Sequence, residues 1–149
     1  DVGFLTDYDA DLGILFGPYL REDPQKLFAI YASDWFKQKE QKLREKGVNI
    51  VMSNYLYGTR QIIANKPIRT PDDLKGMKIR VPNNVMQIKA IESMGATPTP
   101  MPLGDVYPAL TQGMSDGVEN PVSVLYGQKL HEQAKYLSMV NYLTNTSLW

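Results

Sequence analysis

Residues 77–101, MKIRVPNNVMQIKAIESMGATPTPM, form the stretch of sequence that decides the fold. Polar and apolar residues alternate at its start and stop at Pro82, which is the pattern of a short strand with one packed and one outward face. Asn83 or Asn84 can cap a helix, whose apolar positions continue to Gly95. Because residues 96–101 are extended again, the stretch predicts a βαβ unit.

Toward the N-terminus, proline, glycine and capping residues mark further elements. Asp23-Pro24 opens a charged segment with an apolar stripe, which predicts one helix of about six turns ending before Gly47. The β-branched run at 48–52 predicts a buried strand, and residues 59–65 predict a second extended stretch. Thr70-Pro71 predicts a short helix before Gly76.

Toward the C-terminus, strands and helices continue to alternate. Residues 105–112 predict a short helix, Asp116-Gly117 a turn, and Asn120-Pro121 the start of a helix that runs to about Tyr136. Residues 137–143 predict an apolar strand. This alternation predicts the α/β class, as a sandwich with a mainly parallel sheet.

Composition excludes several kinds of protein. With 43% hydrophobic and 21% charged residues, the chain belongs with globular proteins rather than disordered ones. Sixteen basic and sixteen acidic residues balance, so we expect no nucleic acid partner. No apolar run is long enough to cross a bilayer, and no export signal is visible, so we expect no membrane insertion. The lack of cysteine and the single histidine, His131, argue against a metal site and leave no sign of a cofactor.

Arg80 is the most informative candidate for a binding residue. It stands near the carboxyl end of a predicted strand, which is where open α/β sheets bind ligands. A planar guanidinium held there matches a carboxylate by two parallel hydrogen bonds. The alternative is an ordinary ion pair with a nearby acid.

Two other polar residues have open interpretations. Arg60, just past Gly58, is either a second cationic contact for a ligand or a salt-bridge partner. Asn120 can contact a ligand through its amide, or cap the helix that follows, which the local sequence favours. Motifs for phosphate binding, paired catalytic carboxylates and a nucleophile elbow are missing, so we predict a protein that is not an enzyme.

Three segments closely resemble one family: YGTRQIIANKPIRTPDDLKGMKIRVPNN, GATPTPMPLGDVYPALTQGMSDGVENP and GQKLHEQAKYLSMVN. They are similar to the solute-binding proteins of TRAP transporters, the tripartite ATP-independent periplasmic systems. The order of the segments and the spacing from Arg60 through Arg80 to Asn120 match the family pattern. The resemblance implies a periplasmic protein that binds a small organic carboxylate and delivers it to TRAP membrane permease subunits.

The same resemblance assigns site residues. Arg80 would form the bidentate salt bridge to the ligand carboxylate, and Arg60 and Asn120 would add contacts beside it. Asn84 would line the cleft. Leu103 stands where many sialic-acid-binding members carry an aromatic residue, which argues against sialic acid and leaves a sugar acid, a keto acid or a dicarboxylate.

Family members have two lobes that close on the ligand, each a periplasmic-binding-protein-like three-layer α/β/α sandwich. The resemblance therefore predicts a fragment of a two-lobed protein, with residues 1–57 from an incomplete first lobe. Residues 58–145 would form the core of the second lobe, and 146–149 would start the return to the first. We expect such a fragment to self-associate. The competing hypotheses are an enzyme or a sensory module that acts on a small organic acid with the same fold.

Overall fold

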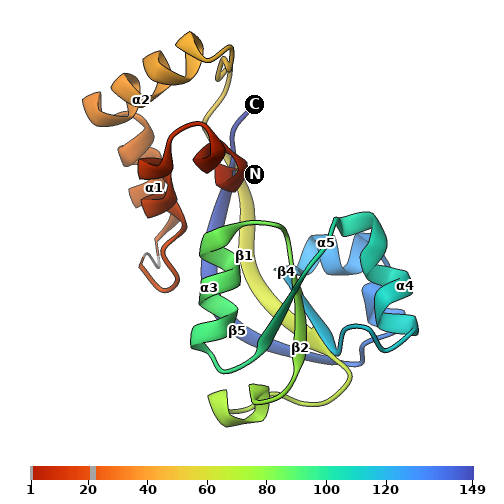
Figure 1. Ribbon diagram of the computed structural model, residues 1–149. Helices are drawn as coiled ribbons and strands as arrows, with labels where there is room; N and C mark the ends of the chain where they lie inside the picture. Colours follow the sequence, from red (N-terminus) through yellow and green to blue (C-terminus); the bar gives the residue numbers. More distant parts are fainter. Residues whose placement is uncertain (1, 21–22) are drawn as a thin grey trace. The chain divides into compact units, whose positions relative to one another are not determined.

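The computed structural model describes residues 2–20 and 23–149. The chain divides into two compact units, the first made of Asp1–Gly58 with Leu143–Trp149 and the second of Thr59–Tyr142. Two long strands, β1 (Tyr55–Ala64) and β5 (Tyr136–Ser147), run through both units (Figure 1). Each unit is described by itself. In the described part of the chain, no helix is both long and apolar enough to span a membrane.

A five-stranded sheet organises the second unit, in the order β3-β2-β4-β1-β5. β2 (Lys78–Val81) runs parallel to both of its neighbours, β3 (Thr97–Pro100) and β4 (Gly117–Pro121). β1 is antiparallel to β4, so the sheet is mixed, with parallel pairing between β2 and β3 and between β2 and β4. The expectation of a mainly parallel sheet holds only for this part.

The strand register sorts side chains onto two faces of the sheet. Paired residues point to the same face, and neighbours along a strand point to opposite faces. Arg80 pairs with Val118, which pairs with Ile63 on its other side, so these three share one face. Ile62 pairs with Glu119, and both lie on the opposite face.

Helices cover both faces, as Figure 1 shows, so the prediction of a three-layer α/β/α sandwich is confirmed for this unit. α3 (Val85–Ser93) packs on the face of Ile62, which we call the α3 face. α4 (Val106–Thr111) and α5 (Val122–Gly127) pack on the face of Val118, called the α4/α5 face. The two cores consist largely of aliphatic side chains, among them Ile79, Val81 and Ile91 on the α3 face and Val106, Leu125 and Leu130 on the other.

The βαβ unit predicted from residues 77–101 is present as β2, α3 and β3. Asn84 is the N-cap of α3, where its Oδ1 accepts hydrogen bonds from the backbone N–H groups of Met86 (3.1 Å) and Gln87 (3.2 Å). Gly95, with φ of 91°, ends the helix in the left-handed region that glycine tolerates best. The short helix predicted after Thr70 is the 3-10 turn Pro71–Leu74.

In the first unit, the single long helix predicted from Pro24 is wrong. Two helices occur instead, α1 (Pro24–Tyr31) and α2 (Asp34–Glu45), after two 3-10 helices, Val2–Asp7 and Ala10–Phe16. Ser33 explains the break, because its hydroxyl accepts from Phe36 N (3.3 Å) and so caps a new helix. The apolar stripe continues across the break, which is why the sequence pattern concealed it.

The buried strand predicted at residues 48–52 is also wrong. The segment is irregular, and Val51 is 81% exposed. The backbone of Met52 exchanges hydrogen bonds with Trp149 (3.1 and 2.9 Å), a single pairing that does not make a strand. A β-branched run is buried only where a second layer covers it, and local sequence does not report that layer.

The segment 116–136 departs from its prediction as well. Gly117 does not finish a turn but begins β4, and the long helix predicted from Asn120 is replaced by α5 and the 3-10 turn Leu130–Glu132. Lys129, with φ of 56°, separates these two elements. The strand predicted at 137–143 is present but longer, as β5. The short helix predicted at residues 105–112 is present as α4. A 3-10 turn, Leu103–Asp105, leads into it.

Gly117 allows β4 to lie close to β1. A Cβ atom added to it would stand 2.7 Å from the Ile63 carbonyl oxygen and 2.9 Å from the Ala64 Cβ, closer than such atoms approach in proteins. Only glycine therefore fits at the start of this strand.

Candidate functional site

The carboxyl ends of three parallel strands meet at one edge of the sheet in the second unit. Arg80 lies near the end of β2, Met101 follows β3, and Asn120 lies near the end of β4. Parallel α/β sheets bind ligands at this edge because loops and helix N-termini diverge there. We take this carboxyl edge as the candidate site.

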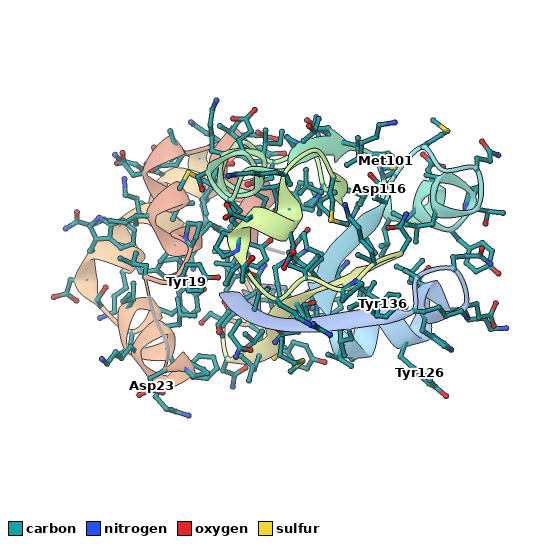
Figure 2. The ribbon with its side chains drawn as sticks, turned by 90° about the horizontal axis from the view of Figure 1, so that it is seen from below. Tyr19, Asp23, Met101, Asp116, Tyr126 and Tyr136 are labelled. Carbon is teal, nitrogen blue, oxygen red and sulfur yellow. The ribbon has the colours of Figure 1, made fainter. Side chains whose placement is uncertain are left out.

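Arg80 is held at this edge by a backbone carbonyl. Its side chain is only 3% exposed, which differs from the outward position expected for it. Nε and Nη2 donate to the Met101 carbonyl oxygen at 2.9 and 2.6 Å. Met101 and Asp116, both labelled in Figure 2, thus secure the two ends of β2, since the Asp116 carboxylate accepts from Lys78 N at 2.8 Å.

Asn120 lies inside β4 and does not cap a helix. The interpretation that the local sequence favoured is therefore wrong, and α5 follows Pro121 without a side-chain cap. Since Val118 shares a face with Arg80, Asn120, two residues further on, lies on that face too. Its side chain is 3% exposed, and its Oδ1 accepts no hydrogen bond from any residue that the structure describes.

Leu103 and Asn84 each follow, within a few residues, a strand that ends at the carboxyl edge. Leu103 follows β3 in a 3-10 turn and packs, partly buried, against the core of the α4/α5 face, the face of Arg80 and Asn120. Asn84 follows β2 by three residues, and its Oδ1 is committed to capping α3. The structure thus brings four of the five predicted site residues to the carboxyl edge.

Arg60 differs from these four. It precedes Ile62 by two residues on β1, so its side chain points to the α3 face, opposite to Arg80. There its Nε donates to Glu119 Oε2, and Nη2 donates to Glu119 Oε1 at 2.9 Å. Arg60 is 2% exposed and Glu119 is fully buried. Of the two interpretations of Arg60, the geometry matches the salt bridge.

Tyr142 completes this buried cluster, since its hydroxyl donates to Glu119 Oε2. Its pKa lies well above the usual value of 10.0, because burial disfavours the phenolate and the Glu119 carboxylate repels it. The phenol therefore stays a donor. We call Arg60, Glu119 and Tyr142 the charged cluster.

Sequence reasoning missed Glu119, Tyr142 and the Met101 carbonyl. Glu119 lies 59 residues from Arg60 and 23 from Tyr142, so only the pairing of β1 with β4 brings them together. The one local signal was a glutamate beside Asn120 between Val118 and Pro121. A carbonyl partner leaves no trace in the sequence at all.

A second group of charges lies in the first unit. Lys39 Nζ contacts Asp9 Oδ2 (3.0 Å) and Asp11 Oδ2, and it stands 5.6 Å from the ring centroid of Trp35. Desolvation by itself would raise the pKa of the Asp9 carboxyl. The hydrogen bond from Lys39 acts in the opposite direction, and the pKa of Asp9 lies below its usual value. These contacts tie the 3-10 helix Ala10–Phe16 to α2. Within residues 2–20 and 23–149, no three His, Cys, Asp or Glu side chains are grouped so that they could hold a metal ion.

Comparison with known proteins gives a consistent result. The family model described as "Bacterial extracellular solute-binding protein, family 7" matches residues 1–148. The sialic acid-binding periplasmic protein SiaP of Vibrio cholerae is 31% identical over 131 residues, which are 88% of this chain and 41% of that protein. The C4-dicarboxylate-binding periplasmic protein DctP of Rhodobacter capsulatus is 31% identical over 125 residues, which are 84% of this chain and 37% of that protein.

Solved structures agree with this family. A TRAP periplasmic solute-binding protein from Ochrobacterium anthropi, with bound L-fuconate, is 70% identical with a TM-score of 0.97, over 99% of this chain and 49% of that one. Another from Actinobacillus succinogenes 130z, with bound L-galactonate, is 41% identical with a TM-score of 0.96, over 99% and 49% of the two chains. The chain spans about half the length of these relatives.

Proposed function

Since the chain belongs to family 7 of the bacterial extracellular solute-binding proteins, those of TRAP transporters, we propose that it captures a small organic acid for transport. It would act in the periplasm and deliver the acid to the TRAP membrane permease subunits. The location is supported by the names of two relatives, both called periplasmic binding proteins. The permease partners are supported by membership of the family, whose solved relatives are TRAP solute-binding proteins.

We propose a sugar acid as the ligand. The support is the 70% identical protein with bound L-fuconate and the 41% identical protein with bound L-galactonate, both open-chain sugar acids. Leu103 argues only against sialic acid, because an aliphatic side chain there departs from the aromatic residue expected for sialic acid binding. A keto acid or a dicarboxylate would be the next candidates.

Arg80 would bind the ligand carboxylate by two parallel hydrogen bonds, a contact between charged groups that contributes about 1.5 to 3 kcal/mol. Asn120 would contact a neighbouring oxygen, and Asn84 and Leu103 would line the site. We give Arg60 an indirect part: through Glu119 it fixes the strand that carries Asn120. The observation that carries the proposal is Arg80 held by a carbonyl at the carboxyl edge.

We further propose that residues 1–57 belong to one lobe of a two-lobed protein, residues 58–145 to the core of the other, and 146–149 to the return. The ligand would shift the protein toward a closed state only by touching both lobes. A chain with half of the lobes' sequence would bind weakly and would self-associate through exposed apolar side chains such as Ile14, Leu20, Val51 and Trp149. Light scattering that finds only monomers at high concentration would contradict the self-association.

The test is a thermal-shift panel of sugar acids, keto acids and dicarboxylates on the full-length protein, followed by titration of the best acid. Arg80→Ala should weaken binding at least tenfold, by the size of a charge-assisted contact. Lys78→Ala is the matched control, because it removes an exposed cation two residues earlier on the same strand. Undiminished affinity in Arg80→Ala would overturn the proposal. Recovery of the acid unchanged after incubation separates binding from the enzymatic alternative.

A further inference from the structure

Asn141 stands out in β5 because its backbone is not extended. Its φ is 48°, in the left-handed region that residues other than glycine rarely adopt. The strand changes character at this point, since the side chains of 136–141 are exposed or partly buried, whereas those of 142–147 are buried. Tyr142, the next residue, is the last of the second unit. The interruption thus occurs where β5 leaves that unit.

One side chain holds Asn141 in this conformation. Gln61 of β1 is 3% exposed, and its Oε1 accepts a hydrogen bond from Asn141 N at 2.9 Å. Its Nε2 donates to Asn141 Oδ1 at 2.6 Å. An unfavourable backbone conformation persists only where its surroundings enforce it, and here the Gln61 amide does so. We call Gln61 and Asn141 the amide latch.

β1 has a corresponding point of freedom. Gly58, the last residue of the first unit on this strand, has φ of 132°, which glycine alone adopts readily. Both strands that run through the two units therefore carry a residue with positive φ close to the boundary between the units. Such residues can absorb the backbone changes of a conformational transition. Gly58 is free to do so, whereas Asn141 is held by Gln61.

The latch is connected to the candidate site through the strand pairing. Gln61 is the cross-strand partner of Asn120 on β4, so the two side chains share a face of the sheet. An acid bound at the carboxyl edge would order β4 and, through this pairing, Gln61. The two hydrogen bonds of the latch are opposed by the strain at Asn141, so a small difference in free energy separates its closed and open forms.

We propose that the amide latch is a conformational switch that responds to the bound acid without contacting it. Closed, it holds Asn141 in the left-handed region. Open, it releases Asn141 to the extended region and changes the course of β5. The acid favours the closed form, and the latch in turn sets part of the affinity for the acid. This inference rests on the proposed function, because it assumes that an acid binds at the carboxyl edge.

Hydrogen exchange at the backbone amide of Asn141 reports the latch directly, because Gln61 Oε1 protects this N–H in the closed form. Exchange is followed by NMR on the full-length protein with and without L-fuconate. The acid should slow exchange at Asn141 about fivefold or more. Gln61→Met, which is similar in size and lacks both hydrogen bonds, should exchange faster than the wild type and respond to the acid by about twofold or less.

Two substitutions of Asn141 separate its backbone conformation from its side chain. Asn141→Gly adopts positive φ without strain, so it should bind L-fuconate within about threefold of the wild type. Asn141→Val is strained there, because a β-branched residue is an outlier at positive φ, and its affinity should be about tenfold lower. Calorimetry measures both affinities. Equal affinities in the two variants would overturn the role of the left-handed backbone.

Gln133 provides the matched control. Its Nε2 donates to the Tyr107 hydroxyl at 2.9 Å, so Gln133→Met removes an amide hydrogen bond elsewhere in the second unit by the same substitution. This variant should keep the wild-type response of Asn141 exchange to L-fuconate. A loss of the response in Gln133→Met as well would mean that any such change disturbs the unit, and would overturn the specific role of Gln61.

The remaining outcomes separate the latch from the proposed function. Unchanged exchange at Asn141 on addition of L-fuconate, or a wild-type response in Gln61→Met, overturns the latch and leaves the role of Arg80 standing. If Arg80→Ala leaves the best acid of the panel bound as before, the proposed function fails, and the coupling of the latch to the carboxyl edge fails with it.

Discussion

The two arginines of the sheet stand on opposite faces and have different partners. Arg60 meets the Glu119 carboxylate and lies in a cluster that Tyr142 completes. Arg80 is oriented by the uncharged carbonyl of Met101 at the carboxyl edge. The contrast teaches that burial alone does not distinguish the two arginines, because both are almost fully buried. The acceptor differs: a carboxylate accepts from Arg60, and a backbone carbonyl accepts from Arg80.

Removing the carboxylate from the charged cluster should have the largest effect. Glu119→Gln keeps the shape of the side chain and leaves the buried Arg60 charge uncompensated, so the free energy of unfolding should fall by about 3 to 5 kcal/mol. Urea denaturation measures this. Arg80→Ala is the comparison, and it should lose clearly less stability. Equal losses in the two variants would break the distinction between the two arginines.

Tyr142→Phe should have a smaller effect, with a characteristic pH dependence. Loss of the hydrogen bond to a carboxylate should lower the free energy of unfolding by about 1.5 to 3 kcal/mol near neutral pH. Because the pKa of Tyr142 is raised in the folded state, its contribution is fully present below the unfolded pKa near 10.0 and is lost as the pH rises above it. The wild type should therefore lose stability more steeply than the variant above that pH. Parallel slopes in urea titrations at pH 9 to about 11.5 would count against this arrangement.

Asn84→Ala should have the smallest effect on the free energy of unfolding. It also tests, at the carboxyl edge, whether a buried polar residue acts on stability or on binding. Removing the cap of α3 should lower the free energy of unfolding by about 1 kcal/mol. Asn84→Ser restores a capping oxygen and should restore the stability. If ligand affinity returns together with stability in the serine variant, Asn84 acts only as a cap. If stability alone returns, its amide contacts the ligand.

The sequence was most informative where local chemistry decides the structure. Pro82, Asn84 and Gly95 each act within a few residues, and the strand, helix and strand that they delimit were predicted correctly. The place of Arg80 near the end of a strand was predicted in the same way, from Pro82 two residues later. Turn and cap residues do this because their effect on the backbone is intrinsic.

Prediction failed where the outcome depends on distant segments. Val51 belongs to an apolar run, yet it is exposed, because burial depends on a covering layer. Asn120 looked like a helix cap because the sequence of β4 does not look like a strand. With polar Glu119 and Asn120 in a fully buried strand, there is no alternation of polar and apolar residues from which the strand could be predicted. Glu119 has a partner 59 residues away, so its role depends on strand pairing. The face to which Arg60 points also depends on that register.

Gly117 has a consequence for evolution at this edge. No larger residue fits there, because a single added methyl group would meet the backbone of Ile63 and push β4 away from β1. Glu119 and Asn120 follow on the same strand, so one substitution would shift both the ion pair and the amide. Position 117 is therefore closed to substitution, and the course of this strand stays fixed while residues outside it, such as Leu103, are free to vary.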